Sequence, residues 1–186
     1  AFEKPLAKSA LETEAVAGRG FIAQPLPGKI TGLQITGVNR LGERLTLKLR
    51  SKGAKHVSGR FVRVINVGNN VFLHLAEVQV FSHGKNIAPK GKASQSSTAF
   101  DGPAKYGNDD NTDGIYQKKS VTHTGQQNNP WWEVDLGREV RIEKLALWNR
   151  TDGGLASRLK QHQVEVFDAK RKVVWQADSK KIFNPS

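Results

Sequence analysis

The 186-residue chain contains no cysteine and no methionine. The absence of cysteine excludes disulfides, thiolate metal sites and cysteine nucleophiles, so only a metal could crosslink its loops. Long apolar runs are missing as well. No stretch approaches the ~18 consecutive apolar residues of a membrane helix, and we therefore expect no membrane insertion.

Acidic residues are few relative to basic ones, because 17 Asp and Glu stand against 29 Lys and Arg, for a net charge of +12. Such an excess can attract nucleic acid or an acidic polysaccharide. The basic residues are nevertheless spread along the chain without a base-reading motif, as on an ordinary solvated surface. The sequence therefore argues against nucleic-acid binding.

The patterns that accompany catalysis are also absent. The sequence has no pair of carboxylates in a recognisable catalytic setting, no serine nucleophile elbow and no phosphate-binding glycine loop. We therefore predict a binding module and not an enzyme. Membership of a larger multidomain protein, including one with a glycosidase, and assembly into a homo-oligomer are both left open.

What the sequence does contain is a β-pattern from Lys29 onward. Eight segments rich in β-branched and aromatic residues alternate apolar and polar side chains, and Gly and Asn separate them. They are "KITGLQITGV", "RLTLKLRS", "GRFVRVINV", "VFLHLAEVQVF", "WWEVDLG", "VRIEKLALWN", "HQVEVFDAK" and "KVVWQAD". Short strands separated by turns predict an all-β fold, an antiparallel β-sandwich.

Residues 1–24 differ from the rest, since they are rich in Ala, Glu and Lys. We predict a leader or linker there, with a short helix that ends before Gly18 and whose start is limited by Pro5. Residues 25–186 are predicted to form a single domain, which is long enough to bury a core.

Two adjacent tryptophans mark one of the predicted strands. Successive side chains of a strand point to opposite faces of the sheet. We therefore expect Trp132, with Val134 and Leu136, to face the core and Trp131 to face outward, and assign neither tryptophan to ligand binding.

Residues 86–130 form a long irregular stretch rich in Ser, Asn, Asp, Gly and Thr. Loops of this length in compact domains are usually functional. Within it, Asp109, Asn111 and Asp113 occupy alternate positions and Gly114 follows them. Oxygen ligands have this spacing at the start of an EF-hand loop. The twelfth position is Ser120 and not a glutamate, so an Asx-rich turn without metal is the open alternative.

Three separated motifs together resemble one family. "NIAPKGKASQSST", "THTGQQNNPWWEVDLG" and "LWNRTDGGLASRLKQHQVEVFD", within residues 85–178, are similar to the F-type lectin (fucolectin) branch of the galactose-binding-like, coagulation factor 5/8 type C jelly rolls. The resemblance implies a jelly-roll fold that binds glycans, most of all L-fucose or a related terminal sugar. It also implies an extracellular, cell-surface or periplasmic location.

The resemblance also implies a sugar site. The family's motif for this site is a His, 26 intervening residues, Arg-x-Asp, four more residues and then a basic residue. This chain has His123, Arg150 and Asp152 at that spacing, whereas Arg158 follows after five residues. Tyr116 falls on the position of an aromatic sugar contact. Gly153-Gly154 replace two cysteines that many members stack under the sugar. The remaining histidines, His56, His74, His83 and His162, are interpreted as structural.

Under the same resemblance the acidic loop implies a Ca²⁺ site. Asp109, Asn111 and Ser120 fall on side-chain ligand positions, and Tyr106 falls on a backbone-carbonyl position. The family's glutamate lies in its last strand; the matching "HLAEVQVF", with Ala76 and Glu77, comes before the rest of the domain. We therefore expect one circularly permuted domain, with its closing strands in 28–82 and its opening strands and site in 83–178. We favour this arrangement over the alternative, in which the tail of one repeat is followed by a truncated second repeat.

The leading prediction is thus a calcium-dependent lectin or carbohydrate-binding module. Two alternatives stay open: a module for galactosides or an anionic polysaccharide, and a protein or nucleic-acid interaction module that uses the basic surface. The exact sugar and its linkage do not follow from the sequence.

Overall fold

A computed structural model describes residues 12–16, 20–24, 32–36, 46–50, 57–159 and 161–179. The strands are β1 (Glu12–Val16), β2 (Gly20–Gln24), β3 (Gly32–Thr36), β4 (Thr46–Arg50), β5 (Val57–Asn66), β6 (Leu75–Ser82), β7 (Lys85–Asn86), β8 (Lys92–Gln95), β9 (Trp131–Ile142), β10 (Lys144–Asn149), β11 (His162–Phe167) and β12 (Val173–Ser179). Four 3₁₀ turns accompany them: η1 (Ala88–Lys90), η2 (Ala104–Gly107), η3 (Tyr116–Lys118) and η4 (Leu155–Arg158). None of the helices in these ranges is long and apolar enough to cross a membrane.

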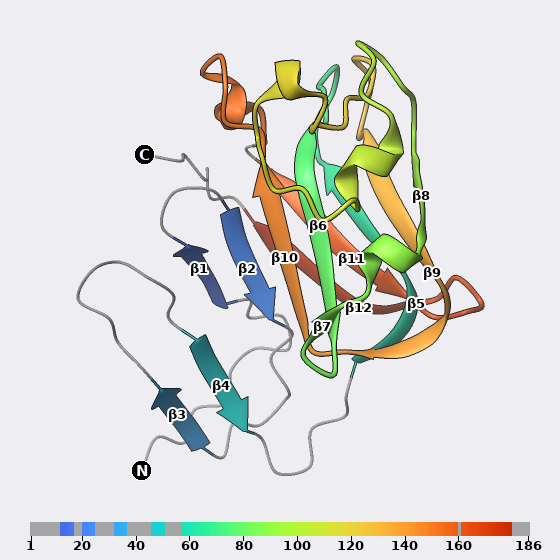
Figure 1. The fold of residues 1–186 in the computed structure, drawn as a ribbon. Coiled ribbons are helices and arrows are strands. Elements are labelled where there is room, and N and C mark those ends of the chain that lie inside the picture. Colours follow the sequence, from blue (N-terminus) through green and yellow to red (C-terminus); the bar gives the residue numbers. More distant parts are fainter. Residues whose placement is uncertain are drawn as a thin grey trace.

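The strands form two five-stranded antiparallel sheets and a separate pair. One sheet has the order β1-β2-β10-β6-β7 and the other the order β12-β11-β5-β9-β8, while β3 pairs with β4. Figure 1 shows the two larger sheets as layers, with β6 and β10 in front of β5, β9 and β11. The predicted all-β, antiparallel sandwich is confirmed.

Each of the eight predicted segments contains a strand, although two boundaries differ. A single strand, β9, covers both "WWEVDLG" and the first residues of "VRIEKLALWN". Strand β6 begins at Leu75 and not at Val71, because Val71 makes only an isolated bridge to Gln127. The four residues before β6 are thereby left as irregular backbone at one end of the sandwich.

The core lies between the two larger sheets. Trp132 is fully buried, and its Nε1 donates a hydrogen bond to the carbonyl of Ala104 at 2.8 Å. Val134 is also fully buried, whereas Leu136 packs at the margin of the core. Trp131 lies on the outer face with the guanidinium of Arg63 over its ring at 4.5 Å. The predicted alternation of the two tryptophans is confirmed.

Within residues 1–24, the predicted short helix is wrong for the two described ranges. Both β1 and β2 are strands, and β2 pairs with β10 at the edge of the first sheet. An exposed sheet edge offers unpaired backbone donors and acceptors, and "GFIAQ" carries the aromatic and β-branched residues that suit a strand. Pairing with a distant strand therefore outweighs the local helix preference. Pro5 and Gly18 lie outside the described residues.

Strands from both parts of the sequence build the same sandwich. Strand β5 lies between β11 and β9, and β6 lies beside β10. Residues 57–82 thus supply strands of both sheets to a fold whose other strands come mostly from residues 85–179.

Candidate functional site

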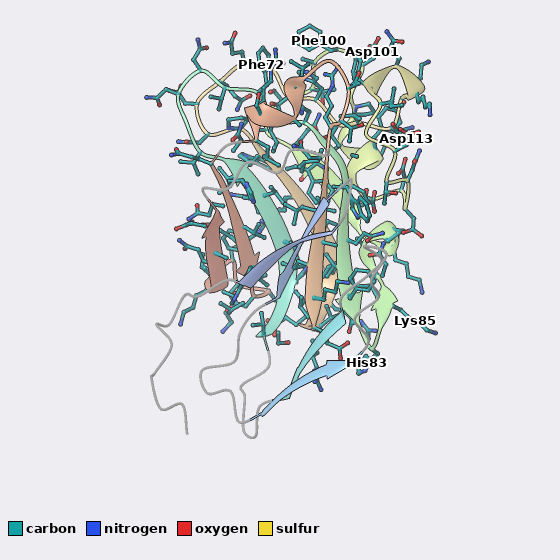
Figure 2. All side chains as sticks on the ribbon, turned by 90° about the vertical axis from the view of Figure 1, so that its left-hand side faces the viewer. Phe72, His83, Lys85, Phe100, Asp101 and Asp113 are labelled. Carbon is teal, nitrogen blue, oxygen red and sulfur yellow. The ribbon has the colours of Figure 1, made fainter. Side chains whose placement is uncertain are left out.

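Four irregular segments meet at one end of the sandwich. They are the segment before β6, the loop between β8 and η2, the turn before β9, and the loop from the end of β10 through η4. Figure 2 shows Phe72, Phe100 and Asp101 at this end, while His83 and Lys85 of the β6–β7 turn lie at the opposite end. Of the residues predicted for the sugar site, His123 lies in the turn before β9 and Tyr116 lies in η3. The other three, Arg150, Asp152 and Arg158, lie in the loop from the end of β10 through η4.

His123 is held by backbone hydrogen bonds on both of its sides. Its N–H donates to the carbonyl of Gly102 at 2.9 Å, and the N–H of Thr124 donates to Leu73 at 2.9 Å. The side chain is only 4% exposed. The ring's orientation is thus set by the fold before any ligand arrives.

The tautomer of His123 follows from its contact with a carbonyl. Nδ1 lies 2.8 Å from the carbonyl oxygen of Thr124, which can only accept, so Nδ1 carries the proton. Burial lowers the pKa of His123, and the neighbouring Arg150 and Arg158 lower it further. The imidazole is therefore neutral at pH 7, and Nε2 presents a lone pair that can accept a hydrogen bond.

Arg150 is fixed by the carboxylate that the sequence predicted would hold it. Its Nε and Nη2 donate to the two oxygens of Asp152 at 2.6 and 3.2 Å, and this pairing lowers the pKa of Asp152. The guanidinium lies over the ring of Tyr116 at 4.6 Å. Nη1 makes no hydrogen bond to the part of the chain that the structure describes, so its donors remain available.

Arg158 reaches the same end of the molecule despite the additional residue before it. Its guanidinium lies over the ring of Phe72 at 4.8 Å. It makes no ion pair or side-chain hydrogen bond within residues 57–159 and 161–179, and it is exposed. A cation held over an aromatic face keeps its hydrogen-bond donors free for a ligand.

Aromatic rings surround His123. Ring centroids of Phe72, Phe100 and Tyr116 lie 5.4, 4.7 and 6.0 Å from that of the imidazole. Sequence reasoning named Tyr116 but missed both phenylalanines, because neither is near His123 along the chain. Phe72 belonged to the predicted strand "VFLHLAEVQVF", and Phe100 lies in the irregular stretch 86–130.

His74 was also missed, because it was interpreted as structural. Its ring lies 5.3 Å from that of His123, it is 1% exposed, and neither nitrogen has a hydrogen-bond partner among the described residues. Burial lowers the pKa of His74 to about 3, with further contributions from His123, Arg150 and Arg158. It is therefore a neutral histidine at the base of the site.

The predicted calcium ligands lie beside this site, and two of them are in contact. Glu77, fully buried on β6, accepts a hydrogen bond from the N–H of Asp109 at 3.1 Å. Its other oxygen, Oε1, is buried without a partner in the described part of the molecule. Burial, and then the nearby Asp109, raise the pKa of Glu77 to about 8. An unsatisfied, buried carboxylate of this kind suits a hard cation.

The other predicted ligands have mixed surroundings. Ala76 lies at a β-bulge, because Trp148 pairs with Glu77 and Asn149 with Leu75, so no β10 residue pairs with it. Ser120 is buried and donates to the carbonyl of Ile115 at 3.0 Å. Tyr106 lies in η2, with Lys105 over its ring at 5.8 Å.

The acidic loop also contains the Asx turns of the alternative interpretation. Side-chain oxygens of Asp109, Asn111 and Asp113 each accept from the N–H two residues later, at 3.0, 3.1 and 3.0 Å. Asp113 pairs with Lys118 at 2.7 Å. No group of three or more His, Cys, Asp or Glu side chains in the described ranges is arranged to hold a metal. A cation would therefore need amide, hydroxyl and carbonyl oxygens besides the two carboxylates.

Comparison with known families identifies the fold. The F5/F8 type C model described as a NedA-like, galactose-binding domain matches residues 106–184. The matched residues include His123, Arg150 and Arg158, together with the loop from Asp109 to Ser120.

The chain is also similar to curated proteins. It is 38% identical over 73 residues to fucolectin-6 of Anguilla japonica, covering 37% of this chain and 39% of that protein. It is 37% identical to the fucolectin of Anguilla anguilla, covering 37% of this chain and 46% of that protein. A pentraxin fusion protein of Xenopus laevis is 36% identical over 78 residues, which cover 41% of this chain and 19% of that protein.

The chain thus spans less than half the length of these curated relatives. No solved structure matches it.

Proposed function

We propose that this chain is a non-catalytic, calcium-dependent lectin or carbohydrate-binding module for L-fucose or a related terminal sugar. The observation that carries the proposal is the meeting of a neutral histidine, two guanidiniums and three aromatic rings at one end of the sandwich. The similarity to proteins named fucolectins supports it.

The site offers complementary partners for neighbouring hydroxyl groups. His123 Nε2 accepts a hydrogen bond from one sugar hydroxyl. Arg150 and Arg158 donate hydrogen bonds to the oxygen of that hydroxyl and to a second oxygen, which belongs either to the neighbouring hydroxyl or to the sugar ring. Asp152 keeps Arg150 oriented, so less conformational entropy is lost when the sugar binds. Aromatic rings cover the apolar C–H surface that a sugar also presents.

Ca²⁺ would bind beside this site and fix the turn ahead of His123. Asp109, Asn111, Ser120 and Glu77 would supply side-chain oxygens, and Tyr106 and Ala76 backbone carbonyls. In such a site the cation supplies structural rigidity and takes no part in chemistry. The buried Oε1 of Glu77 and the bulge at Ala76 support this set.

The circular permutation and an extracellular, cell-surface or periplasmic location belong to the same proposal. The pairing of β5 and β6 with β9, β10 and β11 supports one permuted domain over two incomplete repeats. A link as short as "SHGKN", at the β6–β7 turn, then joins the family's last strand to its first.

The distribution of charge bears on the alternative that uses a basic surface. Residues 57–179, which hold the site, contain 17 Lys and Arg against 13 Asp and Glu, whereas residues 1–56 contain 10 against 4. The part of the chain that holds the site therefore carries a net charge of 17 − 13 = +4 out of the total +12, which argues against an anionic glycan or nucleic acid as the ligand of this site.

The direct test is isothermal titration of L-fucose into the protein with Ca²⁺ present, with His123→Ala and a matched control. We expect saturable binding that His123→Ala weakens at least about tenfold, the value of one lost hydrogen bond in a buried site. His83→Ala, which removes an exposed histidine at the opposite end, should bind as the wild type does. Equal binding by all three proteins would refute this site.

The calcium part of the proposal has its own test. At 100 times its Kd, Ca²⁺ should raise the free energy of unfolding by about 2.7 kcal/mol, and a chelator should remove the gain. Glu77→Gln keeps the shape of the side chain without a charge, so it should fold but gain no stability from Ca²⁺. Identical unfolding curves of the wild type with Ca²⁺ and with chelator would exclude the calcium site.

A further inference from the structure

Asn66, the last residue of β5, is a polar side chain in an otherwise apolar row. It is 2% exposed. Val62 and Val64, which precede it on the same face of the strand, belong to the core between the two larger sheets. Burying an amide in such a place costs free energy unless it is hydrogen-bonded, so the choice of asparagine calls for a reason.

The amide of Asn66 joins two segments that lie far apart in the sequence. Its Nδ2 donates hydrogen bonds to the carbonyl of Phe72 at 2.6 Å and to the carbonyl of Arg158 at 3.0 Å. Both acceptors are carbonyl oxygens, so the nitrogen of the amide must be the atom that faces them. The segment before β6 and the end of η4 are thereby attached to the same rigid strand.

The two residues whose carbonyls are bound also meet through their side chains, since the guanidinium of Arg158 lies over the ring of Phe72 at 4.8 Å. Arg150 is held differently, because the carboxylate of Asp152 pairs with its guanidinium. Arg158 has no such carboxylate among the described residues. Its direction therefore depends on where its backbone and the ring of Phe72 are placed.

The attachment falls where this chain departs from the spacing of the family's motif. Five residues and not four separate Asp152 from Arg158. Two of them, Gly153 and Gly154, have left-handed φ angles of 62° and 67°, and η4 follows directly. A longer loop that contains two glycines has more conformations to lose when it is fixed. Bringing its last residue back to the site therefore requires an anchor.

We infer that Asn66 is a positioning residue that sets the place of Arg158 in the sugar site by binding the carbonyls of Phe72 and Arg158. This inference rests on the proposed function. Asn66 is buried and acts on the sugar only through the arginine. Its removal should consequently lower the affinity for the sugar only while Arg158 is present.

The test is a double-mutant cycle, in which L-fucose is titrated with Ca²⁺ present into the wild type, Asn66→Leu, Arg158→Ala and the double variant. Leucine has the branching of asparagine but no donor. We expect Asn66→Leu to weaken binding about fivefold when Arg158 is present, the effect of about one lost hydrogen bond. In the Arg158→Ala background it should weaken binding by less than about twofold, because residues that act through one another are not additive. NMR titration extends the measurement to weak binding.

A second measurement reads the attachment without sugar. Trypsin cleaves after arginine, at the carbonyl that Asn66 binds, so cleavage of the native protein after Arg158 reports local opening. We expect faster cleavage there in Asn66→Leu than in Val166→Ala, the control, which removes fully buried atoms where β11 pairs with Val62 and Trp175. Arg158→Ala should lack this cut and so identify it. Val166→Ala should bind L-fucose as the wild type does.

Urea unfolding of each variant confirms that it is folded, and Asn66→Ala, which leaves space for water, replaces Asn66→Leu if leucine does not fold. If the wild type binds L-fucose and Asn66→Leu loses the same affinity with and without Arg158, or loses none, the inference is wrong and the proposed function stands. Cleavage after Arg158 that is no faster than in Val166→Ala would overturn it as well. If the wild type binds no L-fucose, the proposed function fails and the inference with it.

Discussion

The chemistry of single residues at the site depends on contacts that fix protonation and direction. The carbonyl of Thr124 makes His123 an acceptor at Nε2, and Asp152 fixes the plane of the Arg150 guanidinium. Both contacts are within a few residues of the group they orient. The site therefore does not need a ligand to organise its polar groups.

Asp152→Asn tests the role of this orientation. An amide cannot pair bidentately with a guanidinium through two oxygens, so Arg150 would lose its fixed direction. We expect the affinity for L-fucose to fall about fivefold to tenfold, together with a loss of about 1–3 kcal/mol in the free energy of unfolding, since the two side chains are only 10% and 24% exposed and Arg150 would lose a charged partner. Titration calorimetry and urea unfolding measure the two quantities. An unchanged affinity would show that Asp152 is not needed to position Arg150.

The pH dependence of binding follows from the lowered pKa of His123. Protonation turns the acceptor Nε2 into a donor and places a third cation beside two arginines, so the protonated form should not bind. Because the pKa lies below the ordinary value of about 6.5, affinity for L-fucose should be constant from pH 8 to 6.5 and fall only at lower pH. Titrations at saturating Ca²⁺ check this. A loss of affinity that begins above pH 6.5 would contradict it.

Among the structural elements, the loop between β8 and η2 determines the geometry of the site. It packs closely on the turn that carries His123, and the approach is possible because Gly102 has no side chain. A Cβ atom there would lie 2.5 Å from the backbone nitrogen and 2.6 Å from the Cβ of His123. The loop and the turn are therefore positioned as one unit.

Gly102→Ala should separate these two elements. Overpacking against backbone typically costs about 1–3 kcal/mol, so we expect that loss in the free energy of unfolding together with weaker binding of L-fucose. Gly125→Ala is the control, since its added Cβ would meet only Ser97 Oγ, at 3.4 Å. Chemical unfolding and calorimetry measure the effects. If Gly102→Ala has the stability and affinity of the control, the close approach is not required.

Strand β6 connects the sugar site to the proposed calcium site. The segment before it carries Phe72 and His74 under the sugar site, and Glu77 follows after three residues and contacts Asp109. A cation held at Glu77 would thus act on the same strand that supports the base of the sugar site. The sequence motif "HLAEVQVF" brings both functions into eight residues.

At the scale of the whole molecule, the sequence predicted what depends on local periodicity or on recognisable spacing. The alternation of Trp131 and Trp132 follows from the period of a strand, and the spacing of His123, Arg150 and Asp152 follows a family motif. Phe72, Phe100 and His74 could not be predicted, because they meet His123 only through tertiary packing. The helix expected in residues 1–24 was wrong for β1 and β2 because β2 pairs with β10, more than 100 residues later.

The measurement that most directly tests whether this molecule binds a sugar through His123 is NMR of the five imidazole side chains with ¹⁵N labelling. Without sugar, His123 should show a proton on Nδ1 and none on Nε2. Saturating L-fucose, with Ca²⁺ present, should shift His123 Nε2 strongly and leave His83 at the opposite end unchanged. A His123 protonated on Nε2, or binding of L-fucose that leaves its resonances in place, would contradict the proposed site.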